Sequence, residues 1–309
     1  MEYGSKARIG YVAVLLCIFL SFFTYSAMAQ CSLEESRALL KFKSVVLDPR
    51  DDLGDWGPES GNCCGWRGVL CSRSGVGGID LDLDVPIRGR TVTIDPNNPQ
   101  ALVIAYEALS KLSQLVIFRT NWVSWRGPLP LRELSKLPLR EIVIRNGDIG
   151  NQGRFGGSLQ NDISNFAGTL EILVIQGSSY NTGLPSALCK LKNLKELEVS
   201  QSWIPNLGPA CLGSLTSLEK VRMQMNRKAT GGLPTWPTRL PNLKVLDFSN
   251  NAHSGSIPAQ YGRLANVQLS LAGNRLSSRI PPALSGKPES TFRPGNEGLC
   301  GAPLQACPA

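Results

Sequence analysis

The sequence predicts an α/β repeat solenoid, with a parallel sheet on its concave face and a disulfide-bonded cap at each end. Three observations predict this fold. An apolar pattern returns at intervals of 23 to 31 residues, a Gly-x-Ile/Leu-Pro motif accompanies it, and cysteines cluster near both ends of the chain. Units that cannot bury their apolar faces alone stack on one another and share a continuous core. We therefore expect a stack of repeats that is closed by caps.

The first thirty residues have the composition of a secretory signal peptide. Lys6 and Arg8 precede an apolar run over residues 9–23, and Ala27 and Ala29 give the small-x-small pattern of a cleavage site. Because the run is short for a membrane span, cleavage is favoured over a retained signal anchor. We expect residues 1–29 to be removed and the chain to be secreted to the extracellular space or the cell wall, with no membrane span after the leader.

Cysteine count and net charge indicate which bonds and partners to expect. Cys17 lies in the leader, which leaves eight of the nine cysteines, an even number that favours disulfides in an oxidising compartment. The formal net charge of +8 at pH 7 favours polyanions such as acidic cell-wall polysaccharide, although it equally serves solubility. We expect no cofactor, no metal and no nucleic-acid partner.

The repeats follow the pattern Leu-x-x-Leu-x-Leu over residues 73–285. Residues i and i+2 of an extended strand share a face, so the paired apolar residues point inward and their neighbours face a partner or solvent. Seven repeats are clear, and Leu81 with Leu83 suggests a degenerate eighth. The inward positions taken as equivalent are Leu115, Ile142, Leu173, Leu197, Val221, Leu246 and Leu269.

Asparagines mark the turns that follow the later strands. Asn226, Asn251 and Asn274 each stand three residues after the last strand apolar residue, where a buried amide can pair with backbone groups of the turn. Ser178, Ser202 and Thr120 hold this position in other repeats. Residues 88–108 fit no repeat, and we expect a long irregular connection or a distorted first repeat there.

Both ends of the chain resemble the caps of plant extracellular leucine-rich-repeat proteins. Residues 30–72 contain Cys31, an amphipathic stretch near Leu39 and the pair Cys63-Cys64, and residues 286–309 contain Gly295 to Leu304. The resemblance implies a right-handed leucine-rich-repeat solenoid and the pairs Cys31 with Cys63, Cys64 with Cys71, and Cys300 with Cys307. Cys189 and Cys211 occupy the same place in neighbouring repeats and either form a bridge or remain small buried side chains.

The concave face is the predicted site for a partner. An apolar track through Val116, Phe118, Val143 and Val174 would mark an interaction surface, or simply reflect the preference of strands for β-branched residues. Arg119, Arg126, Arg132, Arg140 and Arg145 either form a basic patch beside the track or a solvated charged face. The candidate partner-binding residues are Val116, Phe118, Val143, Arg145, Val174, Gln176, Glu198, Arg222, Gln224 and Asp247.

Two aromatic residues and three carboxylates are further candidates. Trp122 and Trp125 follow the second strand and either anchor a partner or cover the eroded first repeats. Asp80, Asp82 and Asp84 alternate along one strand and would attract a cation or a basic partner, although solvent-facing positions alternate in the same way.

The residues do not suggest an enzyme. His253 is the only histidine, and no nucleophile with a base, no three-ligand metal set and no phosphate-binding loop stands out.

The resemblance implies instead a secreted inhibitor of fungal polygalacturonase that acts in plant defence. The alternative is a soluble partner or co-receptor of a membrane receptor kinase. A third class, ice binding, needs a row of small hydroxyl side chains, and Ser200, Ser249 and Ser270 form only an interrupted one.

Overall fold

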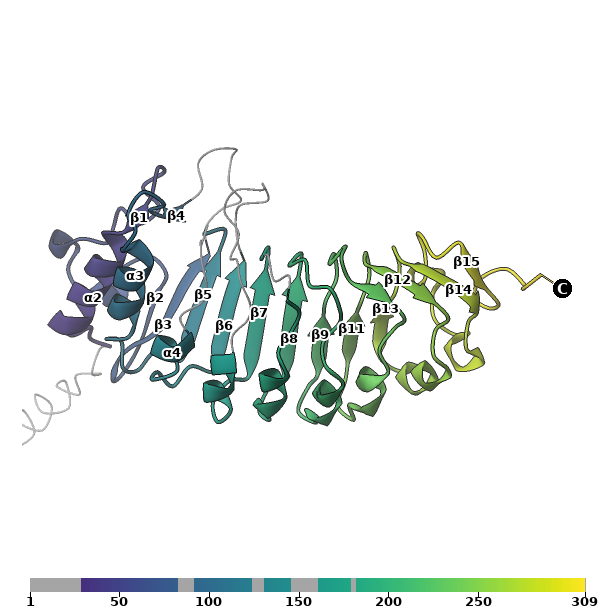
Figure 1. Cartoon of the computed structure of the whole chain (residues 1–309). Coiled ribbons are helices and arrows are strands. Elements are labelled where there is room, and N and C mark those ends of the chain that lie inside the picture. Colours follow the sequence, from purple (N-terminus) through teal and green to yellow (C-terminus); the bar gives the residue numbers. More distant parts are fainter. Residues whose placement is uncertain (1–28, 83–91, 124–130, 146–160, 179–181, 309) are drawn as a thin grey trace, which may run out of the picture.

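The computed structural model describes residues 29–82, 92–123, 131–145, 161–178 and 182–308. The expected signal peptide lies outside these residues. The chain forms an elongated stack of repeats, and successive strands lie side by side from the N-terminal to the C-terminal end (Figure 1). The predicted leucine-rich-repeat solenoid is thereby confirmed. One continuous apolar core runs through the stack.

A nine-stranded sheet lies along one side of the stack, in the order β13-β11-β9-β8-β7-β6-β5-β3-β2. All neighbours are parallel except β2 and β3, which pair antiparallel. The strands are β2 (Val69–Ser72), β3 (Gly75–Asp82), β5 (Ile117–Asn121), β6 (Glu141–Arg145), β7 (Ile172–Gln176), β8 (Glu196–Ser200), β9 (Lys220–Arg222), β11 (Val245–Asp247) and β13 (Gln268–Ser270).

Short helices return the chain on the opposite side of the core. Their apolar residues alternate with exposed ones, and Leu188 and Leu212 are fully buried. Each helix thus supplies the half of the core that its strand lacks. The helices are α4 (Leu131–Leu134), η3 (Asn161–Phe166), η4 (Ser186–Lys190), η5 (Ala210–Ser214), η6 (Trp236–Arg239), η7 (Ala259–Leu264), η8 (Pro282–Leu284) and η9 (Glu289–Thr291).

A second, four-stranded sheet forms beside the last repeats, in the order β10-β12-β14-β15. It consists of β10 (Thr230–Gly231), β12 (Ala252–Gly255), β14 (Arg275–Arg279) and β15 (Gly298–Cys300), all parallel. The sequence analysis did not predict this sheet. Its strands are short and rich in Ser and Gly, so they lack the apolar alternation that indicates a strand.

The N-terminal cap covers the first strand with a helix. Helix α2 (Leu33–Lys43) begins with a capping box, in which Ser32 accepts from the Glu35 nitrogen and Glu35 accepts from the Ser32 nitrogen. The helix buries Leu39 and Phe42 against Trp56. Two short helices, η1 (Pro58–Ser60) and η2 (Cys63–Gly65), lead into β2.

The stretch that fits no repeat is ordered where the structure describes it. Residues 92–108 contain β4 (Thr93–Ile94), which pairs antiparallel with β1 (Val46–Leu47), and most of helix α3 (Ala101–Leu109). Of the two expected alternatives, the irregular connection is wrong for this part, and the distorted first repeat fits it, because helix α3 returns the chain between β3 and β5. Five residues of α3 are buried, Ala101, Ala105, Tyr106, Ala108 and Leu109, so the helix extends the core between the cap and β5.

The asparagine ladder forms as predicted in the later repeats. Asn226 donates to the carbonyls of Val199 (2.7 Å) and Met223 (3.0 Å) and accepts from the Ser202 nitrogen (2.8 Å). Asn251 and Asn274 make the corresponding pairs of donations. Buried Asn296 continues the ladder into the C-terminal cap, a role that the sequence analysis missed.

Four disulfides join the cysteines. The bridges at the ends are Cys31–Cys63, Cys64–Cys71 and Cys300–Cys307, with Cα–Cα distances of 5.6, 5.5 and 4.8 Å. These are the pairs that the resemblance implied. Cys189 and Cys211 are also bridged, with a Cα–Cα distance of 5.7 Å, so the disulfide alternative holds for them. This bridge links η4 to η5 on the side opposite the sheet.

Candidate binding surface on the concave face

The concave face is the face of the nine-stranded sheet that points away from the core. The strand register places Phe118 opposite Ile142, and Ile79 opposite Phe118. The middle position of each strand on this face is therefore held by Asp80, Arg119, Val143, Val174, Glu198, Arg222, Asp247 and Ser270.

Two predicted site residues are wrong because the register of one repeat was shifted. The sequence analysis equated Leu115 with Ile142, which placed Val116 and Phe118 on the concave face. Phe118 is instead a core residue with 1% exposure, and Val116 lies before β5. Thr120 likewise lies inside β5 rather than in the following turn. The step of 24 residues from Phe118 to Ile142 matches the steps between later repeats and was the available signal.

The apolar track is not exposed. Val143 and Val174 do lie on the concave face, but they are only 3% and 2% exposed. They line a pocket together with the longer side chains of Arg119, Glu141 and Arg145. Long neighbours from adjacent strands cover a short β-branched side chain between them. The prediction of an exposed apolar patch is therefore wrong.

Ion pairs neutralise most of the predicted basic patch. Arg119 contacts Glu141 through two hydrogen bonds of 2.6 and 2.7 Å and reaches Asp80 at 2.9 Å. The bond to Glu141 contributes most to raising the pKa of Arg119, since it favours the charged guanidinium. Arg140 pairs with Glu171, and Arg132 with Asp162, whereas Arg126 lies outside the described residues.

Arg145 keeps a charge that no carboxylate neutralises among the described residues. Its guanidinium donates to the neutral Asn121 side chain at 3.1 Å, and no salt bridge involves it in this part of the structure. It lies at the end of β6, next to Gln176 at the end of β7. Both side chains are half-buried, so they are accessible to a partner.

The later strands present a mixed polar surface. Glu198 is 7% exposed and accepts from the Ser200 hydroxyl at 2.7 Å, so it is less accessible than predicted. Arg222 pairs with Glu196 at 2.7 Å, and Asp247 accepts from the Ser249 nitrogen at 2.9 Å. The Gln224 side-chain oxygen is buried and has no hydrogen-bond partner among the described residues.

A pocket of about 320 Å³ lies on the concave face over strands β3, β5, β6, β7 and β8, and we call it the concave notch. Three carboxylates and two guanidinium groups line it, together with an amide and three aliphatic side chains. Because the groups come from five neighbouring strands, the parallel ladder fixes their spacing. The lining residues are Asp80, Arg119, Asn121, Glu141, Val143, Arg145, Ile172, Val174 and Glu196.

The remaining candidates do not converge on a chemical centre. Asp80 is paired with Arg119, and Asp84 and Trp125 lie outside the described residues. Within the described ranges no group of three His, Cys, Asp or Glu side chains could hold a metal ion. His253 is buried in β12 of the second sheet, where its Nδ1 lies 3.1 Å from the Gly231 carbonyl. Burial lowers the pKa of His253.

Two of the three serines proposed for an ice-binding row are buried. Ser200 has no exposure and Ser249 has 7%. A row of hydroxyl groups on the concave face is therefore absent at these positions. In the part of the chain that the structure describes, no helix is long and apolar enough to cross a membrane.

The structure has the leucine-rich-repeat fold, a solenoid with disulfide-bonded caps at its ends. Two family models match, the leucine rich repeat N-terminal domain over residues 32–72 and the leucine rich repeat over residues 242–264. The first model covers the N-terminal cap and the second covers about one repeat, and the resemblance of the chain to plant receptor-like proteins and receptor-kinase ectodomains is confirmed. Such a fold is typical of binding modules rather than of enzymes.

Three known proteins illustrate the similarity. Receptor-like protein EIX1 of Solanum lycopersicum is 25% identical over 270 residues, which is 87% of this chain and 23% of that protein. The Arabidopsis receptor kinase HAESA, in complex with the peptide hormone IDA and the co-receptor SERK1, has a TM-score of 0.61 at 20% identity and covers 89% of this chain and 46% of HAESA. A plant ice-binding protein has a TM-score of 0.58 at 19% identity, covering 91% and 99%.

The chain spans 23%, 33% and 29% of the length of three curated relatives, all receptor-like proteins or receptor-like kinases. The structural matches at 19% and 20% identity establish the fold alone.

Proposed function

We propose that this chain is an extracellular module that binds a polypeptide partner at the concave notch. The observation that carries the proposal is the notch itself, an opening of about 320 Å³ on a rigid sheet that offers charges of both signs and an amide. Polar groups held by a regular scaffold recognise a partner at low entropic cost. The relation to receptor-like proteins, and the HAESA complex with a peptide hormone, support a polypeptide as the partner.

The charges of the notch favour a polypeptide over a polyanion. Its carboxylates, Asp80, Glu141 and Glu196, outnumber its guanidinium groups, Arg119 and Arg145. A galacturonate polymer would place repeated carboxylates beside these acidic side chains, and like charges repel. A peptide can match both signs of charge with its own side chains. Acidic cell-wall polysaccharide is therefore not the ligand that we assign to the notch.

The finer assignment that we favour is a soluble partner or co-receptor of a membrane receptor kinase. It is supported by the receptor-like relatives and by the co-receptor present in the HAESA complex. The second candidate, an inhibitor of polygalacturonase in the cell wall, is supported by the net charge of +8, which favours association with the acidic polysaccharide on which such an enzyme acts.

Two measurements separate these candidates. Reducing-end release from polygalacturonate, by a panel of fungal polygalacturonases with and without the mature protein, tests inhibition directly. Binding of the mature protein to immobilised receptor-kinase ectodomains tests the first assignment. Inhibition of any enzyme together with no ectodomain binding would support the inhibitor, and the reverse pattern would support the receptor partner.

Arg145→Glu tests the location of the site. The variant reverses the one charge of the notch that has no carboxylate partner among the described residues, so it should weaken partner binding without disturbing an ion pair. Arg263→Glu, on the exposed side of η7, is the matched control. Equal affinity of the wild type and Arg145→Glu for the partner would show that the partner does not bind at the concave notch.

A further inference from the structure

A turn with positive backbone φ follows the strands of the large sheet. It falls three residues after the middle strand position, and the backbone nitrogen there donates to the next repeat, as in Met225 to the Ser249 carbonyl at 3.0 Å. The register makes six residues equivalent at this turn. They are Trp122 (φ 63°), Gly177 (76°), Gln201 (50°), Met225 (60°), Asn250 (56°) and Gly273 (70°).

The fold itself does not require a large side chain at this turn. Glycine makes the same turn in two repeats, at positions 177 and 273, and it adopts positive φ without a steric cost. A large residue such as Met225 is strained in this region of backbone space. Glycine at position 225 would remove this backbone strain. The presence of methionine there therefore points to a role of its side chain other than stabilising the turn.

Met225 and Trp203 present apolar surface at this edge. Met225 is 41% exposed and Trp203 is 40% exposed, and both have positive φ, 60° and 58°. The Lys228 ammonium lies 4.8 Å from the centroid of the Trp203 ring, within range of a cation–π interaction. Exposed Trp203 lies beside the Lys228 ammonium, and exposed Met225 lines a pocket with Arg227, so apolar and cationic groups alternate at this edge.

A cationic pocket of about 350 Å³ adjoins Met225. The guanidinium groups of Arg227 and Arg275 line it together with the Asn250 side chain, and no carboxylate is among its lining residues. Neither arginine has a salt bridge within the described residues, unlike Arg119 and Arg222 on the concave face. Two unneutralised positive charges in one pocket attract carboxylates.

We propose that this surface, formed by Trp203, Met225, Arg227, Asn250 and Arg275 and here called the edge site, binds an acidic segment of a protein partner. Carboxylates of the segment pair with Arg227 and Arg275, and an apolar side chain of the segment packs against Met225 and Trp203. The edge site shares no residue with the concave notch, so it does not depend on what binds there.

The composition of the edge site favours a protein over an acidic polysaccharide. Tryptophan, methionine and arginine are enriched at protein interfaces, where they supply most of the binding energy. A uronate polymer would satisfy the arginines, but its hydroxyl-covered surface would leave the apolar face of Met225 without a matching group.

The test is fluorescence anisotropy of a labelled peptide that alternates glutamate with leucine, titrated with the full mature protein at low salt. The double variant Arg227→Gln and Arg275→Gln should raise the Kd at least about fivefold, the effect of losing two exposed ion pairs. The matched control removes the same charge from exposed positions elsewhere, with Arg37→Gln on α2 and Arg263→Gln on η7. An equal loss in the control would mean that net charge alone attracts the peptide and would overturn the proposal.

Met225→Gly tests the apolar half of the site separately from folding. Glycine keeps the positive φ, so the melting temperature should not fall, whereas the Kd for the peptide should rise about threefold or more. Unchanged affinity in this variant would overturn the role of Met225. Oligogalacturonate of matched charge is the third arm, and tighter binding of it than of the peptide, with the same dependence on Arg227 and Arg275, would overturn the choice of a protein partner.

Discussion

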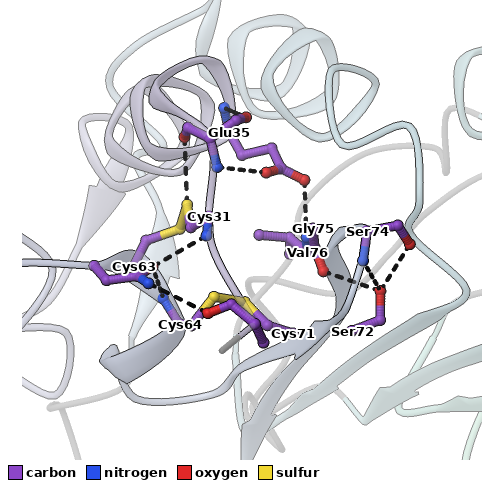
Figure 2. Close-up of a disulfide and its surroundings, with 12 residues drawn as sticks. Cys31, Glu35, Cys63, Cys64, Cys71, Ser72, Ser74, Gly75 and Val76 are labelled. Atoms are coloured by element: carbon purple, nitrogen blue, oxygen red, sulfur yellow. Dashed lines mark hydrogen bonds between the residues drawn. A yellow bond between two sulfur atoms is a disulfide. The ribbon is translucent and has the colours of Figure 1, made fainter. Parts of the chain in front are cut away.

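The Glu35 carboxylate accepts a hydrogen bond of 2.8 Å from the backbone nitrogen of Val76 (Figure 2). Its other oxygen accepts from the Ser32 nitrogen at 2.8 Å, so one buried side chain closes the start of α2 and attaches the cap to β3. Figure 2 places this link beside the Cys31–Cys63 disulfide. The cap is thus joined to strand β3 by a hydrogen bond as well as by apolar packing.

Glu35→Ala should destabilise the protein by about 1–3 kcal/mol, because it leaves the buried Val76 nitrogen without an acceptor and removes the capping box. Urea unfolding measures the change. Glu34→Ala is the control, since Glu34 is the exposed neighbour in the same turn. Similar losses in the two variants would contradict the role given to Glu35.

Gly75→Ala should be destabilising for a related reason. Gly75 has φ 123°, and an added Cβ would lie 2.4 Å from the Glu35 oxygen. Neither the backbone nor the carboxylate can accommodate the methyl group without moving. Gly286→Ala is the control, because a Cβ there meets nothing within 4 Å and φ is not positive. A thermal melt in which both variants match the wild type would be evidence against this close contact.

The asparagine ladder predicts a large effect of Asn226→Leu. The buried backbone groups of Val199 and Ser202 lose their partner at once, and the Met223 carbonyl keeps only the donation from Asn251. Each unsatisfied group costs about 1–3 kcal/mol, so partial unfolding of the middle repeats is expected in amide hydrogen exchange. Asn242→Leu should have little effect, since its one bond to the Thr216 carbonyl is exposed. Wild-type protection around Asn226 in the variant would contradict the ladder's role.

The ion pair between Arg119 and Glu141 should be worth about 1 kcal/mol in a double-mutant cycle with Arg119→Gln and Glu141→Gln. The bond is bidentate and Glu141 is only 12% exposed. The pair Lys41 and Glu107, with side chains 51% and 58% exposed, should couple far more weakly. Comparable coupling energies in the two cycles would mean that partial burial does not strengthen the ion pair between Arg119 and Glu141.

Stability should fall as the pH drops below about 6.5, the ordinary pKa of histidine. Burial lowers the pKa of His253 in the folded state, so the unfolded chain binds the proton first and gains stability relative to the fold. Unfolding free energies at pH 7.5 and 5.5 avoid the titration of most carboxylates. His253→Gln should flatten this dependence, because the chain has no other histidine, and an unchanged slope would disprove the assignment.

The repeat pattern predicted the solenoid, the later strands and the asparagine ladder, because each is set by local spacing. From Leu173 onward the predicted register agrees with the structure. In β5 the predicted inward residue was Leu115, whereas Phe118 is the one that pairs with Ile142. Both are buried, so the apolar residues alone did not decide the register.

The candidate site was harder to predict than the fold. Whether Val143 is covered, or Arg119 is neutralised, depends on side chains from neighbouring strands that are 22 to 39 residues away along the chain. Such contacts leave no local pattern. The edge site was not predicted, for a similar reason. Met225 has a positive φ, and Arg227 and Arg275 line one pocket, only because the repeats stack on one another.

The most direct test of the central claim is photo-crosslinking with a benzophenone amino acid placed at position 176, at the end of β7 on the concave face, or at position 260, on the opposite side in η7. Each protein is mixed with the receptor-kinase ectodomain or polygalacturonase that binds the wild type, and adducts are mapped by mass spectrometry. If the partner binds at the concave notch, adducts form from position 176 and none form from position 260. Adducts from position 260 alone would contradict binding at the concave notch.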